Sequence, residues 1–314
     1  MSSSTSAPKQ SEFIRYLRLF LEWSQAMNYS VETTKTRDTC VRRFIVWCDD
    51  RAITRPQDIT ASVLERYRRY LFHYRKSNGA PLAFSTQHSH LAPIKAFFKW
   101  LNKENHILYN PASEFELPRV PKHLPKDFFS EEEIDAMIEH TQIYGDLGIR
   151  DRAIIETFYS SGIRRMELVN LKLQDVDLKR GTLVVFEGKY KKDRVVPIGK
   201  RACNWVDKYM TLVRPSLIKG DDNGFTFLTE KGQPFIKNRI SDLVKKYKQA
   251  VGVDKPGACQ LFRRSMATHM LENGADIRYI QEILGHVNLS TTQIYTQVSI
   301  KKLKQVHAST HPAR

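Results

Sequence analysis

Four prolines crowd a short central stretch of this chain: Pro111, Pro118, Pro121 and Pro125. A proline fixes the backbone φ angle, removes an amide donor and restricts the residue before it, so this stretch favours an extended connection over a helix. Helix-like patterns stand on both sides, and 314 residues are enough for two separate cores. The sequence therefore predicts domains at residues 11–108 and 129–314, a linker at 109–128 and a flexible Ser-rich tail at 1–10.

The first domain carries four amphipathic helical patterns. Each begins after a residue that can cap a helix, and these are Ser11, Ser30, Thr60 and Ser85. Pro93 falls inside the fourth pattern and predicts either a kink or a helix that begins later. We therefore expect a compact bundle of four helices.

The second domain mixes helices with short strands. Ser130 and Glu133 form a capping box that begins the first helix, and a mostly apolar helix is expected at 150–160. Strand-like runs are expected at 176–177, 182–186 and 194–198, a small hairpin at 225–235 and a basic helix at 238–250. These patterns predict a mainly α fold with a small β-sheet.

Charge and cysteine content narrow the class of protein. The net charge is +16 and is spread along the chain, which favours a nucleic acid as partner ahead of a membrane. The four cysteines form no CxxC pair and are expected to be reduced and half-buried, as in a cytosolic protein. No apolar run approaches the ~20 residues that a membrane span needs.

The stretch from residue 258 to 295 concentrates reactive side chains. It places Gln260, Arg263, His286 and Tyr295 around two short helices; the first stops at Asn273-Gly274 and the second begins after Asp276 and ends at Gly285. On its own this pattern fits a buried ion pair and an ordinary half-buried tyrosine equally well.

Several such motifs together resemble the tyrosine recombinase (phage integrase) family and its Xer subgroup. They are Gly162-x-Arg164-x-x-Glu167, the Gly188-Lys189 hairpin, Arg263, Leu284-Gly285-His286 and Tyr295, together with the linker and the C-terminal tail. The chain departs from the family at Gln260, where a His is usual, and at Tyr190, where a Gly is usual.

The resemblance implies a four-helix core-binding domain and an α+β catalytic domain that close around DNA as a clamp. The implied catalytic residues are Arg164, Lys189, Gln260, Arg263, His286 and Tyr295, with Glu167 in support. The residues expected to contact DNA are Arg37, Arg42, Lys95, Lys191, Arg239, Lys245 and Arg264. Lys191 is also the alternative to Lys189, and any one of these basic residues could instead belong to a solvated helix face.

The chemistry needs these residue types. Two arginines, Arg164 and Arg263, can hold the charge that develops on a phosphate under attack. The sequence shows no carboxylate cluster of the metal-binding kind, so no metal, cofactor or ATP is expected. Tyr295 would form a 3′-phosphotyrosine and Lys189 would protonate the leaving oxygen. Gln260 can donate a hydrogen bond but cannot exchange a proton, so a slower reaction is expected.

The leading prediction is a site-specific DNA recombinase that acts through a Holliday junction. It would bind inverted half-sites as a dimer and act as a tetramer assembled through its C-terminal tail, and the departure at Gln260 favours a mobile-element role. An accessory DNA-bending or directionality factor stays open. The alternatives are a DNA-binding protein that has lost activity and a relaxing enzyme like type IB topoisomerase. The expected location is the cytoplasm, at the nucleoid, with no membrane contact.

Overall fold

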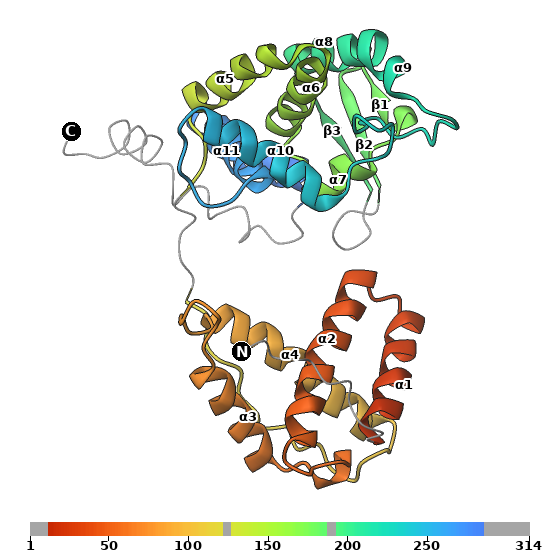
Figure 1. Ribbon diagram of the computed structural model, residues 1–314, viewed down its shortest axis with the longest axis vertical. Helices are drawn as coiled ribbons and strands as arrows, with labels where there is room; N and C mark the ends of the chain where they lie inside the picture. The colour runs from red at the N-terminus through yellow and green to blue at the C-terminus, as the bar shows by residue number, and fades with distance from the viewer. Residues whose placement is uncertain (1–11, 122–126, 187–192, 286–314) are drawn as a thin grey trace, which may run out of the picture. The chain divides into compact units, whose positions relative to one another are not determined.

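The computed structural model of the chain describes residues 12–121, 127–186 and 193–285 (Figure 1). The chain divides into two compact units, residues 1–122 and 123–314. Each unit has a hydrophobic core of its own. The described residues are mostly helical with one small antiparallel sheet, which confirms the predicted fold class.

Four helices build the first unit: α1 (Glu12–Ala26), α2 (Val31–Asp49), α3 (Ala61–His73) and α4 (Phe84–Lys103). The two interior caps are as predicted, because Ser30 accepts from the Thr33 amide at 3.2 Å and Thr60 accepts from the Val63 amide at 3.4 Å. The fourth helix begins at Phe84, one residue before the cap predicted at Ser85.

Helix α4 runs through Pro93 and does not begin after it. A proline inside a helix leaves the carbonyl four residues earlier without its amide partner. Here that carbonyl belongs to Ser89, and the Cys40 thiol of α2 donates to it at 3.6 Å. A side chain of the neighbouring helix therefore supplies the missing contact.

Helix α4 contacts all three other helices of its unit. Large aromatic side chains fill the space between them, among them Phe20, Phe44 and Phe97. The chain after α4 also enters this core, since Ala112 and Phe115 are buried in it. The first unit therefore includes part of the 109–128 segment that the sequence assigns to the linker.

Among its described residues, the second unit contains eight α-helices and three strands. The helices are α5 (Glu131–His140), α6 (Gly145–Ser161), α7 (Arg165–Asn170), α8 (Lys200–Lys208), α9 (Arg214–Leu217), α10 (Lys237–Ala250), α11 (Cys259–Glu272) and α12 (Ile277–Leu284). The strands β1 (Val176–Asp177), β2 (Thr182–Val185) and β3 (Arg194–Pro197) form an antiparallel sheet in that order.

Three expectations need correction, two for this unit and one for the cysteines of both units. Helix α6 begins at Gly145, five residues before the predicted start at Arg150. The hairpin predicted at 225–235 is reduced to one bridge between Leu228 and Pro234, because a proline cannot donate to a strand ladder. The four cysteines are free, as predicted, but they are buried and not half-buried.

Helix α6 lies at the centre of the second unit, where it contacts α8, α11 and β3 (Figure 1). The rings of Phe158 in α6 and Phe262 in α11 stack with their centroids 6.1 Å apart. Helix α12 contacts both α11 and β3. The ends of α6, α12 and β3 are thereby held near one another, and the candidate site forms there.

Candidate active site

A tight turn joins α6 to α7 and faces α11. Gly162 ends α6 with φ of 59°, in the left-handed region that favours glycine. A Cβ atom at this position would lie 2.1 Å from Cε of Met266 in α11 and 3.2 Å from Cδ2 of Leu284 in α12. The left-handed backbone therefore favours glycine here, and any larger residue would also displace the Met266 side chain.

Glu167 caps α7 from within the helix. Arg164 stands at the cap position, where its side chain cannot accept a hydrogen bond from the helix. The Glu167 carboxylate accepts instead from the Arg164 backbone amide at 2.7 Å and from Arg164 Nη1 at 2.7 Å. One carboxylate therefore fixes both the backbone and the guanidinium of Arg164.

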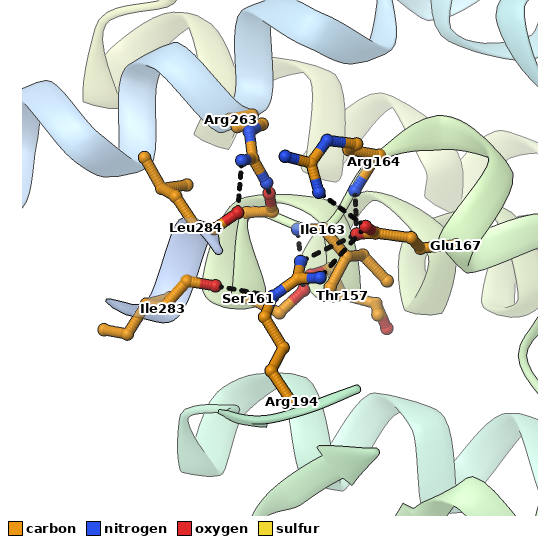
Figure 2. Close-up of polar contacts among 10 residues, drawn as sticks. Thr157, Ser161, Ile163, Arg164, Glu167, Arg194, Arg263, Ile283 and Leu284 are labelled. Carbon is orange, nitrogen blue, oxygen red and sulfur yellow. Dashed lines mark hydrogen bonds and ion pairs between the residues drawn. The ribbon is translucent and has the colours of Figure 1, made fainter. Parts of the chain in front are cut away.

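Arg194, the first residue of β3, holds the same carboxylate (Figure 2). Its Nη1 and Nη2 donate to the two oxygens of Glu167 at 3.0 and 2.8 Å, and its Nε donates to the Ile283 carbonyl at 3.0 Å. From the sequence, Arg194 has no predicted role beyond starting a strand. Its position next to the predicted Gly188-Lys189 hairpin was the one available signal, and that signal does not identify a partner 27 residues away.

The carboxyl of Glu167 is ionised in this environment. Its side chain is only 5% exposed, and this burial raises its pKa. The hydrogen bonds and charge of Arg194 and the hydrogen bonds from Arg164 more than reverse that effect, so the pKa of Glu167 falls to about 2.

Arg263 connects the turn at Gly162 to the end of α12. It is buried in α11, and it donates to the Gly162 carbonyl at 2.7 Å and to the Leu284 carbonyl at 2.5 Å (Figure 2). Gly285 follows with φ of 62°, and a Cβ atom there would lie 2.9 Å from Cδ of Arg194. The structure thus brings Arg164, Glu167 and Arg263 together, as the sequence predicts, and adds Arg194.

The site carries an excess of positive charge. Arg164 and Arg194 share the one carboxylate of Glu167, while Arg263 donates to backbone carbonyls, and Arg164 is the most exposed of the four side chains at 27%. Gln260 is exposed on the first turn of α11, three residues before Arg263 and so on a neighbouring part of the same helix face. Such an arrangement suits an anion.

Four residues that the sequence assigns to catalysis or DNA contact lie outside the described residues: Lys189, Lys191, His286 and Tyr295. Three of them are close in sequence to described parts of the site. The segment 187–192 connects β2 to β3, and His286 directly follows Gly285.

In the first unit, two predicted DNA contacts are engaged with their own unit. Arg37 donates to Ser24 Oγ at 2.7 Å and lies over the Tyr29 ring at 3.9 Å. Lys95 donates to the Phe115 carbonyl at 2.6 Å. Arg42 pairs with Asp38 at 2.7 Å and is the one of these three whose side chain is exposed to solvent.

In the second unit, α10 presents an exposed basic face. Arg239 pairs with Glu230 at 3.1 Å and Lys245 pairs with Asp242 at 3.2 Å, and exposed pairs of this kind are weak. Lys245 also lines an open polar cavity of about 620 Å³ together with Arg165 and other residues of α10. Arg264 turns elsewhere and donates to the Asp127 carbonyl at 3.4 Å.

The described residues contain neither a cluster of metal-ligating side chains nor a helix suited to a membrane. Within ranges 12–121, 127–186 and 193–285, no three His, Cys, Asp or Glu side chains are grouped so that they could hold a metal ion. In the same part of the chain, no helix has the length and apolar character to cross a membrane.

Comparison with known proteins places this geometry in a family. The model of the phage integrase family matches residues 127–302, and that of the phage integrase SAM-like domain matches residues 12–117. Tyrosine recombinase XerC 2 of Ralstonia nicotianae is 50% identical over 300 residues, which cover 96% of this chain and 86% of that protein. Tyrosine recombinase XerD of Lacticaseibacillus casei is 33% identical over 302 residues, 96% of this chain and 97% of that one.

Solved structures agree. XerA recombinase is 29% identical with a TM-score of 0.53, over 95% of this chain and 99% of that one. XerH site-specific recombinase bound to a palindromic difH substrate has a TM-score of 0.71 at 20% identity, over 95% of this chain and 84% of that one, and this likeness concerns the fold alone.

Proposed function

Because this chain belongs to the phage integrase family and is a site-specific tyrosine recombinase of the Xer type, we propose that it cuts and rejoins double-stranded DNA through Tyr295. The observation that carries the proposal is the arginine site around Glu167, where Arg164 and Arg263 are fixed against one turn. Among the described residues, these arginines bond to backbone carbonyls and to one carboxylate, so the positive charges outnumber the negative ones.

The two arginines would bind the phosphate that is cut. Arg164 uses Nη1 on Glu167, and its Nε and Nη2 have no partner among the residues that the structure describes. Planar guanidinium donors match the oxygens of a phosphate, and a site fixed in advance stabilises the transition-state charge without rearranging. Arg263, buried and anchored, would add the second positive group.

The reaction would exchange one phosphodiester for another. Oη of Tyr295 forms a bond to phosphorus, the bond from phosphorus to the 5′ oxygen breaks, and the 3′ end stays attached to the enzyme. The phenolic proton leaves to water or a basic group, and Lys189 gives a proton to the 5′ oxygen. Attack by a 5′ hydroxyl of a partner strand reverses these bond changes, so no ATP is consumed.

His286 and Gln260 would donate hydrogen bonds to the same phosphate. Gln260 is exposed on the first turn of α11, at the edge of the arginine site. Its amide can position a phosphate oxygen but cannot take the phenolic proton. We therefore propose that the chain cleaves DNA more slowly than it would with a histidine there.

Strand exchange would need more than one copy of the chain. We propose a dimer on each pair of inverted half-sites, a tetramer on two duplexes assembled through the C-terminal tail, and a Holliday junction between the two exchanges. A mobile-element role and an accessory DNA-bending or directionality factor belong to the same proposal. The competing candidate is a DNA-binding protein without activity, and Gln260 is the residue that favours it.

A trapping assay separates these candidates. Duplexes bound by the protein are selected from a random pool, and nicked suicide substrates are made from them. Wild type should give a covalent protein–DNA band on a denaturing gel, and Tyr295→Phe should bind the same DNA and give none. Binding by wild type without a band would establish the inactive candidate instead.

A further inference from the structure

Arg194 directs every part of its guanidinium into the interior of the site. Its side chain is 11% exposed, and its three nitrogens donate to two carboxylate oxygens of Glu167 and to the Ile283 carbonyl (Figure 2). Each of the three nitrogens is thus engaged with the protein. Arg194 therefore differs from Arg164, whose Nε and Nη2 have no partner among the described residues and whose side chain is more exposed, at 27%.

These contacts join three segments that are distant in sequence. Arg194 stands at the start of β3, Glu167 lies in the first turn of α7, and Ile283 lies at the end of α12. The last of these segments continues through Gly285 into residue 286. Gly285 lies so close to Arg194 that a Cβ atom there would come within 2.9 Å of its Cδ.

We propose that Arg194 is a positioning residue for DNA cleavage, which holds the Glu167 carboxylate that orients Arg164 and fixes the end of α12 from which residue 286 continues. The proposal rests on the proposed function and names a residue that acts on the phosphate through Arg164. A fork of two parallel bonds sets the plane of a carboxylate, and that carboxylate in turn sets the plane of the Arg164 guanidinium.

A lysine could not replace the fork. Its ammonium is a single point of charge, so it would keep the attraction to Glu167 but leave the carboxylate free to rotate. It would also lose one of the two links, to Glu167 or to Ile283. The substitution Arg194→Lys therefore separates charge from geometry.

The chain offers a closely matched control in Arg214. This arginine is 7% exposed, forks onto Asp222 at 2.9 and 2.7 Å, and donates from Nε to the Phe225 carbonyl at 3.1 Å. It belongs to the same unit, and within the described residues its hydrogen bonds and ion pair go to Asp222, Phe225 and Thr226, not to Glu167 or α12. Arg214→Lys should therefore reproduce the loss of stability without the loss of positioning.

The test compares wild type, Arg194→Lys and Arg214→Lys on one suicide substrate. The measured quantities are the melting temperature, the DNA dissociation constant and the single-turnover rate of covalent complex formation at saturating protein. We expect similar melting temperatures and DNA affinities for the two variants. Cleavage should be ~100-fold slower in Arg194→Lys, since small misplacements in an active site cost about this much, and close to wild type in Arg214→Lys.

Two results would overturn the proposal in distinguishable ways. If wild type cleaves and Arg194→Lys cleaves as fast as Arg214→Lys, Arg194 is merely structural and the proposed function stands. If wild type binds DNA but forms no covalent complex, the proposed function fails and the role of Arg194 fails with it.

A second variant tests the interaction between Arg194 and Glu167 through the carboxylate, and it can be measured even if Arg194→Lys does not fold. Glu167→Gln keeps the size of the side chain and removes the charge that the fork holds. We expect it to slow cleavage by a similar factor. Where Arg194→Lys folds, the double variant should lose little more, because the effects of residues that act as a unit are not additive. Fully additive losses would show that Arg194 acts independently of Glu167.

Discussion

Glu167 connects the stability of the second unit to pH. Its pKa is about 2 in the folded chain against an ordinary value of 4.5. The ionised carboxyl therefore contributes stability that is complete above pH 4.5 and is lost as the pH falls towards 2. The shift corresponds to roughly 3 kcal/mol.

We predict that Glu167→Gln flattens the acid limb of the stability profile. Wild type should lose unfolding free energy between pH 4.5 and 2 more steeply than the variant, by roughly 3 kcal/mol over that range. Urea unfolding at a series of pH values measures this difference. Parallel profiles for the two proteins would show that the Arg194 fork does not hold Glu167 ionised.

The effect of Gln260 is also decided by a single residue, because proton exchange at this position depends on which side chain stands there. A histidine can exchange a proton near neutral pH, whereas the amide of Gln260 cannot. We predict that Gln260→His speeds cleavage ~10-fold or more and adds a rise in rate around a pKa of ~6.5. Single-turnover cleavage from pH 5.5 to 9 tests this. An unchanged rate with an unchanged profile would mean that position 260 does not take part in proton transfer.

At the scale of elements, helix α6 positions the turn at Gly162. The first turn of α6 is itself tightly packed. A Cβ atom on Gly148 would lie 2.0 Å from the Thr141 carbonyl oxygen, which is backbone and cannot swing aside. Helix propensity alone would make Gly148→Ala stabilising by up to ~1 kcal/mol. The clash should outweigh this gain, because overpacking costs ~1–3 kcal/mol.

We therefore predict that Gly148→Ala lowers the unfolding free energy by ~1–2 kcal/mol net of its helix propensity. Urea unfolding followed by circular dichroism measures it. Gly145→Ala is the control. Its φ of 54° means that an alanine strains the backbone, but a Cβ atom there meets nothing within 4 Å, so this variant measures strain without a clash. A Gly148→Ala protein more stable than wild type would contradict the packing of α6 against the preceding turn.

The elements predicted best from sequence were those with local signals. The caps at Ser30, Thr60, Ser130 and Asp276 are all present, because a cap depends on residues within one helical turn. The hairpin predicted at 225–235 is present only as one antiparallel bridge, because Pro234 has no amide to donate to a longer ladder. The pattern of apolar residues that predicted the hairpin does not take the missing amide into account.

The residues of the candidate site also differ in how far their partners lie along the sequence. Arg164 and Glu167 lie three residues apart, so their pairing was visible as a short motif. Arg194 was missed because its partners, Glu167 and Ile283, are 27 and 89 residues away, and only the folded chain brings them together. Arg37 and Lys95 looked like open basic residues for the same reason, since the aromatic ring and the carbonyls that engage them come from other segments.

At the scale of the whole molecule, the charge of +16 should dominate binding to DNA. A protein that neutralises about ten phosphates loses affinity with a log–log slope on salt near −9. We predict a slope of this size, measured by fluorescence anisotropy from 50 to 300 mM salt. Arg239→Ala and Lys245→Ala should each reduce the slope by ~1 without changing sequence preference. A nearly flat dependence would contradict the proposal that both units grip the duplex.

The central claim is that Tyr295 becomes joined to a 3′ phosphate, and one measurement addresses it directly. The trapped complex would be digested with protease and nuclease, and the peptide that carries a nucleotide identified by mass spectrometry. We predict that the modified residue is Tyr295, linked through the 3′ phosphate, and that the released strand ends in a 5′ hydroxyl. A nucleotide on any other residue, or a link through a 5′ phosphate, would contradict the account.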